Sequence, residues 1–311
     1  MKQINQFINE YIIKKKLDKP IDSENHFEYH PKTNDELIEN LNKLVENNIY
    51  DFNCIDTSEI TDMSDLFYDS KFEETNIDIS EWNVSNVKNM RCMFKDCENF
   101  NCDLSNWNVS NVTNMSYMFD NCTDFEGKGL ENWDVSNVEI TKYMFYNCEN
   151  FNCDLSNWDV SSVTNMERTF YGCEIFEGKG LENWNVSNVT NMCNMFQCCE
   201  NFTGKGLDKW NVGNVKYTKY MFFECTKFDC DLSNWNVSKV KDMKYMFYKC
   251  ENFTGKGLEN WDVNNVKYIA RMFTDCGNFD CDLSNWNVSK VKNTYNMFYG
   301  CNILKNIPSW Y

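Results

Sequence analysis

The chain has 311 residues, a net charge of −17 from 30 Lys and Arg against 47 Asp and Glu, and 17 cysteines. This balance disfavours a nucleic-acid partner, because phosphate backbones are bound by clustered cations and the sequence concentrates Lys and Arg nowhere. Neither a secretory apolar region nor a run of about 18 apolar residues is apparent. We therefore expect no membrane insertion, and no export through a conventional signal.

Residues 1–17 are predicted to form an amphipathic helix that ends before Pro20. Its apolar side chains recur at helical spacing: Ile4, Phe7, Ile8, Tyr11 and Ile12. A polar link follows to about residue 32. It contains His26 and His30, whose spacing would suit a zinc-binding pair on a helix, but Pro31 disfavours a helix there.

Thr33 and Glu36 form a capping-box pattern, which predicts a second helix to about residue 47. We expect this helix to cover the open first turn of a repeat array, because terminal repeats need a polar cap. The predicted organisation is a helical extension and cap over residues 1–50 and a solenoid over residues 51–311.

A unit of 25 or 26 residues repeats from about residue 80 to the end. A period of this length predicts a solenoid, in which each unit buries its apolar face against its neighbours. The repeat is marked by a column of tryptophans: Trp82, Trp107, Trp133, Trp158, Trp184, Trp210, Trp235, Trp261 and Trp286. Residues 52–78 form a degenerate first unit, with Ile55 in place of Trp.

Other columns keep a fixed distance from each Trp. Leu lies three residues before it, Val two and five after, Phe twelve after, Cys fifteen after and Phe again eighteen after. Identical apolar residues in every turn indicate a continuous core. Trp184→Ala should therefore cost roughly 3–5 kcal/mol.

Two local patterns within each unit favour regular structure. The apolar spacing of NVTNMSYMFDNC (residues 111–122) predicts a short helix, and the alternation in DLSNW (residues 103–107) predicts a short strand. Units of 26 residues replace CDLSNW by GKGLENW, where we expect the glycine pair to form a β-bulge. The predicted fold class is α/β, a right-handed leucine-rich-repeat-type solenoid of about ten turns.

The cysteines fall mainly into regular columns. Stacked thiols would lie about 4.8 Å apart with parallel side chains, which is poor geometry for a disulfide. We therefore expect free thiols and a reducing compartment, or at least a fold that does not need oxidation. No CxxC pair occurs and both histidines lie outside the repeats, so no metal site and no cofactor are expected.

The units WNVSNVTNMSYMFDNC and FNCDLSNWDVSSVTNM resemble the repeats of BspA-like leucine-rich-repeat surface proteins, and IDTSEITDMSDLF (residues 55–67) is similar to how such arrays begin. The resemblance covers roughly residues 30–310. It implies an adhesion or ligand-binding module at a cell surface, without enzymatic activity. Cytoplasmic and virion-associated locations are alternatives.

Recognition in such an array belongs to the columns that vary. Two residues before the Phe column lie the candidate ligand-binding residues Tyr117, Tyr143, Arg168, Tyr220, Tyr245 and Arg271. Tyr and Arg are enriched in interfaces. The alternative is that these side chains only stack between turns. An Asn column just before Trp, with neighbouring carboxylates, offers a second polar face for glycan or peptide unless its amides satisfy each other.

Catalysis finds no support in the sequence, because a triad or metal site needs unlike residues that converge once. The predicted function is a non-enzymatic scaffold that binds a protein or glycan. The alternative is a structural or assembly protein, for example of a virion, that associates end to end through the open C-terminal edge. Association of the chain that depends on protein concentration would favour the assembly protein over the binding scaffold.

Overall fold

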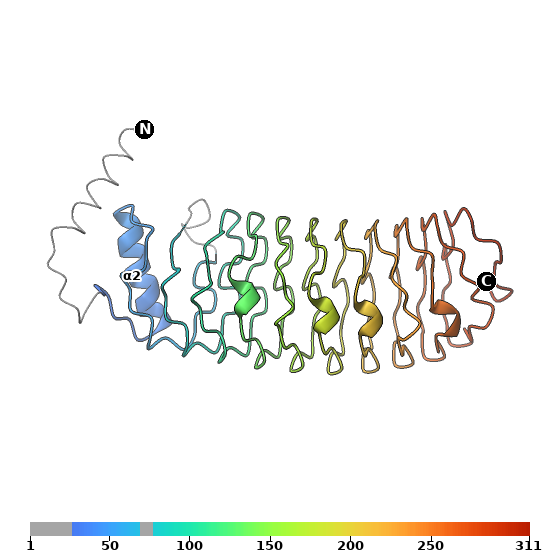
Figure 1. Ribbon diagram of the computed structural model, residues 1–311, viewed down its shortest axis with the longest axis horizontal. Coiled ribbons are helices and arrows are strands. Elements are labelled where there is room, and N and C mark those ends of the chain that lie inside the picture. The colour runs from blue at the N-terminus through green and yellow to red at the C-terminus, as the bar shows by residue number, and fades with distance from the viewer. Residues whose placement is uncertain (1–26, 69–76) are drawn as a thin grey trace, which may run out of the picture.

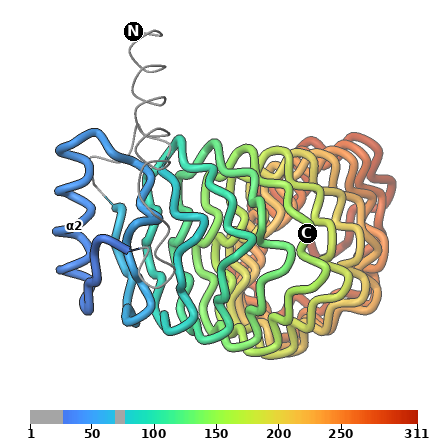
Figure 2. The backbone as a smooth tube through the Cα atoms, turned by 60° about the vertical axis from the view of Figure 1, so that its left-hand side comes forward, coloured from blue at the N-terminus to red at the C-terminus, as the bar shows by residue number. Residues whose placement is uncertain are grey.

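The computed structural model describes residues 27–68 and 77–311. The predicted helix at residues 1–17 and His26 lie outside the described residues. Figure 1 shows the rest as a row of similar coils stacked along the long axis, with one helix at the N-terminal end. The coils keep the same register along the stack (Figure 2). The chain is thus a tandem-repeat solenoid, as its period predicts.

Helix α2 (Asn34–Glu46) confirms the second predicted helix. The Thr33 hydroxyl accepts a hydrogen bond from the backbone N–H of Glu36, 3.2 Å away. The Glu36 carboxylate accepts from the N–H of Lys32, one residue earlier than in a standard capping box. Leu37, Leu41 and Leu44 are buried in the same core as the coils, so the helix packs onto the stack through its apolar face.

The predicted short helix inside each unit is wrong. Met93 and Lys95 donate to carbonyls three residues earlier, whereas Cys92 and Phe94 donate to carbonyls of the next coil, at 3.0 and 2.9 Å. Backbone N–H groups thus alternate between tight turns and neighbouring coils. Successive turns, each closed by a bond to the third preceding residue, place apolar residues three and four positions apart. This spacing is close to that of an α-helix, which is why the pattern predicted one.

The predicted strand at DLSNW is also wrong. The N–H of Trp107 bonds to the carbonyl of Leu104 at 3.1 Å, which makes a turn. In the 26-residue units a 3-10 helix stands at this place: η1 (Leu130–Asn132), η2 (Leu181–Asn183), η3 (Leu207–Lys209) and η4 (Leu258–Asn260).

The glycine pairs of the longer units begin these 3-10 helices and form no bulge. Gly180 has φ +94°, and a Cβ there would lie 2.2 Å from the backbone nitrogen of Ser156 in the preceding coil. The left-handed backbone and the close approach both require glycine.

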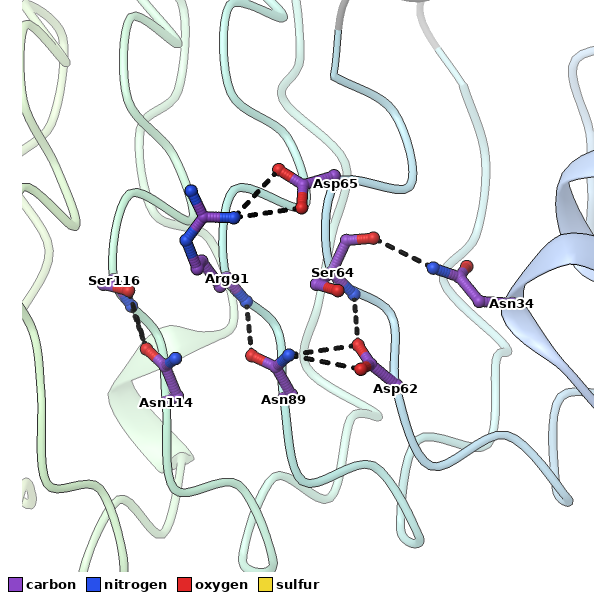
Figure 3. A network of polar contacts seen from close by, with 8 residues as sticks. All are labelled: Asn34, Asp62, Ser64, Asp65, Asn89, Arg91, Asn114 and Ser116. Carbon is purple, nitrogen blue, oxygen red and sulfur yellow. Dashed lines mark hydrogen bonds and ion pairs between the residues drawn. The ribbon is translucent and has the colours of Figure 1, made fainter.

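Strand-like pairing in the described coils consists of isolated parallel bridges. Two of them, Tyr29–Ile55 and Asp51–Asp78, lie at the N-terminal end, and the others form a series at the seventh residue after Ile55 and after each Trp from Trp82 to Trp261. The residues of this series are Asp62, Asn89, Asn114, Ile140, Asn165, Asn191, Tyr217, Asp242 and Tyr268. Where the residue is Asn or Asp, its side chain accepts the N–H two residues on, as Asp62 and Asn89 do for Ser64 and Arg91 (Figure 3). Asx turns thus accompany these bridges, and the pairing does not extend into a strand.

The core consists of the predicted columns. Successive Phe rings of the twelfth-residue column stack 5.3–5.9 Å apart from Phe67 to Phe298. Each Trp ring donates its Nε1–H to a carbonyl of the preceding coil, such as Trp133 to Leu104 at 3.3 Å. Ile55 and Phe67 take the expected places in the first unit and are buried. Within the described residues no helix is both long and apolar enough to cross a bilayer.

Candidate binding surface

The six candidate residues occupy a column whose backbone is left-handed in every coil. From Cys92 to Asn296, φ at this column lies between 51° and 60°. Glycine, Asn and Asp adopt this conformation most easily, whereas Tyr and Arg are unfavourable there. The left-handed turn determines the backbone conformation at this column, but it does not require a large side chain. The structure therefore leaves the choice of Tyr and Arg to be explained by what the side chains contact.

The first three candidates form one continuous run. The rings of Tyr117 and Tyr143 stack at 4.6 Å with an angle of 20°. The Arg168 guanidinium lies 4.9 Å from the Tyr143 ring and donates a hydrogen bond to its hydroxyl. All three side chains are half-buried, because each covers a face of its neighbour and leaves its edge in solvent.

The last three candidates repeat this arrangement. Tyr220 and Tyr245 stack at 4.6 Å with an angle of 9°, and Arg271 lies 5.8 Å from Tyr245. Asn194 separates the two runs and donates to the side-chain oxygen of Gln197. The column from Tyr117 to Asn296 thus reads Tyr, Tyr, Arg, Asn twice, a period of four coils. This period of four coils is present in the sequence when the column is read in order, but it was not predicted.

A second row of rings lies beside the first. It follows the Phe column by one residue and contains Tyr146 and Tyr171, stacked at 4.5 Å, and Phe223 and Tyr248, stacked at 4.7 Å. Tyr143 contacts Tyr146 at 5.4 Å, so the two rows join. Stacking between turns, the alternative explanation, is therefore present. Stacking explains how the faces of the rings are buried, and it leaves the half-exposed ring edges accessible to a ligand. Ligand binding by the six residues stays a prediction.

Four amides of the Asn column before Trp bond to the backbone of the preceding coil, those of Asn106, Asn157, Asn183 and Asn234. The amides of Asn157 and Asn183 donate to the carbonyls of Glu131 and Ser156 in the preceding coil, at 3.1 and 3.2 Å. Carboxylates beside this column are also engaged, since Glu131 accepts the N–H of Gly129 at 3.0 Å. This face offers fewer free polar groups than the sequence indicates.

The expectation that cations are spread evenly is wrong. Six residues after Trp, four successive coils of the C-terminal half carry an exposed lysine: Lys216, Lys241, Lys267 and Lys292. We call these four residues the lysine ladder. Their backbones bond directly to one another, since the N–H of Lys241 donates to Lys216 and that of Lys267 to Lys241, both at 2.9 Å. Stacking brings together residues that lie 25 or 26 positions apart.

Three of the four lysines of the GKG segments are different, because they are paired: Lys128, Lys179 and Lys256. Lys128 Nζ lies 2.7 Å from Asp103 Oδ2 and Lys179 Nζ 2.7 Å from Asp154 Oδ2. Hydrogen bonds from these lysines lower the pKa of Asp103 and Asp154 to about 2. Cations at this edge of the coil are thus balanced by carboxylates of the preceding coil.

One carboxyl group is buried beside the Tyr117 ring. Burial raises the pKa of Asp120 to about 6, against the opposing charge of Lys95 at 3.5 Å. Lys95 also lies 5.7 Å from the centre of the Tyr117 ring. This pair closes the N-terminal end of the first run.

The cysteine thiols serve the core. All seventeen lie in the described residues as free thiols. Those of the regular column donate to a Phe carbonyl of the preceding coil, as Cys148 does to Phe119 at 2.9 Å. Burial raises the pKa of Cys153 to about 12, which opposes thiolate chemistry. The described residues contain no cluster of metal-ligating side chains, and His30 instead contacts Asp56 at 3.3 Å.

Of three comparisons with known proteins, one places the chain in a family. The sequence profile of a family described as "Mycoplasma protein of unknown function, DUF285" matches residues 34–155, 123–229, 166–259 and 231–311. Among curated proteins no match is found. A solved structure with some similarity is described as "Crystal structure of TLR13-ssRNA13 complex", at 12% identity and a TM-score of 0.20, over 88% of this chain and 51% of that one. The chain spans about half of that protein, and the likeness is too weak to indicate a fold or a ligand.

Proposed function

The chain belongs to the family described as Mycoplasma protein of unknown function, DUF285, and we propose that it is a non-enzymatic scaffold that recognises a protein or glycan. Repeats cover nearly all of the described chain, and their constant columns form the core. Variation is left to columns at the surface, which is how repeat proteins carry binding sites. An adhesion-like role at a cell surface belongs to this proposal and is supported by the BspA-like resemblance. The proposal also includes a right-handed leucine-rich-repeat organisation of about ten turns with a helical cap.

The observation that carries the proposal is the pair of Tyr–Tyr–Arg runs. Asn fits the same left-handed position in Asn194 and Asn296, so the fold does not need Tyr or Arg there. Each run instead presents two phenol edges and one guanidinium in a fixed row. Rigid aromatic side chains with a cation beside them suit recognition, because little side-chain entropy is lost on binding.

The test uses two matched variants. Tyr117 and Tyr143 are changed to Asn in one, and Tyr220 and Tyr245 in the other. Both are probed with wild type on arrays of proteins and glycans. Ile175→Asn is the control, because it removes an exposed apolar side chain at a position where Asn150 stands in the preceding coil. Loss of a ligand by either Tyr variant and not by the control supports the proposal. A ligand that both Tyr variants retain would overturn the placement of the site.

The second candidate function, assembly, is favoured by the last coil. Large apolar side chains are exposed there: Tyr295 by 58%, Tyr299 by 66%, Ile303 by 48% and Ile307 by 65%. Exposed apolar surface of this kind is typical of an interface. Sedimentation at increasing protein concentration tests it, since Ile307→Lys should abolish association. A wild type that stays monomeric at all concentrations would exclude this function.

A further inference from the structure

The lysine ladder is a row of like charges without carboxylate partners among the described residues. Among the described residues, none of its four ammonium groups forms an ion pair. Adjacent rungs lie about 4.8 Å apart, the spacing of paired backbones, so the four span roughly 15 Å. Like charges directly opposite each other on paired backbones are destabilising. Folding alone therefore gives no reason for this ladder.

The same column in the N-terminal coils shows what the fold prefers. The column there reads Lys88, Thr113, Glu139, Thr164 and Thr190. Each of the three threonines donates its hydroxyl to the carbonyl of the same column in the preceding coil, at 3.3–3.4 Å. A neutral side chain thus fits the position and gains a hydrogen bond. The N-terminal column thus never places two like charges on adjacent coils, whereas the ladder places four in succession.

Neighbouring columns extend the charge. We define the basic strip as residues 214–220, 239–245, 265–271 and 290–296. It holds nine basic residues and one acidic residue, Asp242. The equivalent segments of the four preceding coils, residues 111–117, 137–143, 162–168 and 188–194, hold two basic and two acidic residues. In a chain of net charge −17, the strip concentrates positive charge on one side of the C-terminal half.

We propose that the basic strip binds an acidic polysaccharide, a chain that carries carboxylate or sulfate groups along its length. The proposal rests on the scaffold function above and names its ligand class. Ammonium groups repeated once per coil meet anionic groups repeated along a linear polymer. The C-terminal Tyr–Tyr–Arg run lies beside them, with the Lys219 ammonium 4.9 Å from the Tyr220 ring.

Two other polyanions fit this surface less well. Single-stranded nucleic acid needs open aromatic faces on which bases stack. In the strip most faces are already occupied: Tyr220 and Tyr245 stack on each other, and Tyr268 lies 4.8 Å from Lys244. Tyr295 lies 5.4 Å from Arg271, which leaves Tyr217 as the one exposed ring of the strip with no ring or cation against it among the described residues. An extended acidic peptide gains its affinity from main-chain pairing at a free edge. The ladder backbones already bond to one another, so no edge is free there.

The experiment measures binding of the full chain to immobilised heparin and hyaluronate, with neutral dextran as the reference. The test variant changes Lys216, Lys241, Lys267 and Lys292 to Thr, the residue that the N-terminal coils carry at this position. A control variant changes four lysines of the GKG segments to Thr: Lys128, Lys179, Lys205 and Lys256. Both variants lose the same charge, and circular dichroism with thermal unfolding verifies that each is folded.

We expect wild type to bind at least one acidic polysaccharide and not dextran, with an affinity that falls as salt rises. The ladder variant should lose about tenfold or more in affinity, and the control variant about twofold at most. Absence of binding by folded wild type, or equal losses in both variants, would overturn the inference. Tighter binding of single-stranded oligonucleotide or polyglutamate at the same salt would overturn the ligand class.

The two proposals fail separately. If the Tyr variants lose an array ligand while wild type ignores acidic polysaccharides, only the basic strip is refuted. If the ladder variant loses polysaccharide binding while both Tyr variants behave as wild type on the arrays, the strip stands and the Tyr–Tyr–Arg runs are refuted as the site.

Discussion

The N-terminal coils (residues 107–194) and the C-terminal coils (residues 210–296) share one frame and differ in charge. Both contain a Tyr–Tyr–Arg run on left-handed backbone and the same stacked core. Beside the first run, the sixth column after Trp carries Thr hydroxyls and Glu139. Beside the second it carries the lysine ladder. The difference teaches that stability governs the constant columns, whereas the surface columns diverge without disturbing the coil.

The largest expected effect tests whether the frame is the same in both halves. Trp158 and Trp235 are equally buried, and each donates to a Leu carbonyl of the preceding coil at 2.7 Å. Changing either to Ala should lower the free energy of unfolding by roughly 3–5 kcal/mol, since a large cavity and an unpaired carbonyl remain. Urea denaturation measures both. If the two variants lose free energies of unfolding that differ by more than about 1 kcal/mol, the two halves do not share one frame.

A somewhat smaller loss is expected from the glycine that begins η2. In Gly180→Ala the new Cβ would meet the backbone of Ser156, and the left-handed φ adds strain. We expect a loss of at least about 2 kcal/mol in the free energy of unfolding. Gly277→Ala is the matched control in the C-terminal half, because its Cβ would meet only the Glu251 carbonyl, at 3.9 Å. Equal losses in the two variants would contradict the account of the 26-residue units.

Asp120 gives the N-terminal coils a pH dependence of their own. Its folded pKa of about 6 lies above the usual 3.8, so its favourable contribution is complete below pH 3.8 and is lost as pH rises through 6. Asp120→Asn does not titrate. The variant should therefore gain stability relative to wild type between pH 4 and 7.5, by about 2 kcal/mol. Denaturation curves at both pH values measure this, and a difference independent of pH would refute it.

The smallest effect belongs to the lysine ladder. Lys241→Thr removes a charge between two others and restores a hydroxyl that can reach the carbonyl below, as Thr164 does. At low salt the variant should be more stable than wild type by about 0.2–1 kcal/mol. In about 1 M salt the difference should shrink, since the Debye length falls to about 3 Å. An increase in stability that salt does not alter would show that repulsion is not its cause.

The sequence alone determined the core and the repeat of this protein. Columns at fixed distances from Trp predicted which side chains are buried, because a position that recurs in every unit must stack on its own copies. The first-unit assignments at Ile55 and Phe67 and helix α2 were predicted for similarly local reasons, from register and from the cap at Thr33. The column of six candidate residues was also visible as one that varies.

Only the tertiary structure decided the path of the coil and its surface charge. Phe94 bonds to Met118 and not to its own turn, because its partner lies 24 residues away, beyond the reach of any local pattern. The lysine ladder is likewise four separate lysines in the sequence, 25 or 26 residues apart. It becomes a ladder because stacking sets equivalent positions about 4.8 Å apart, a distance at which their charges act together.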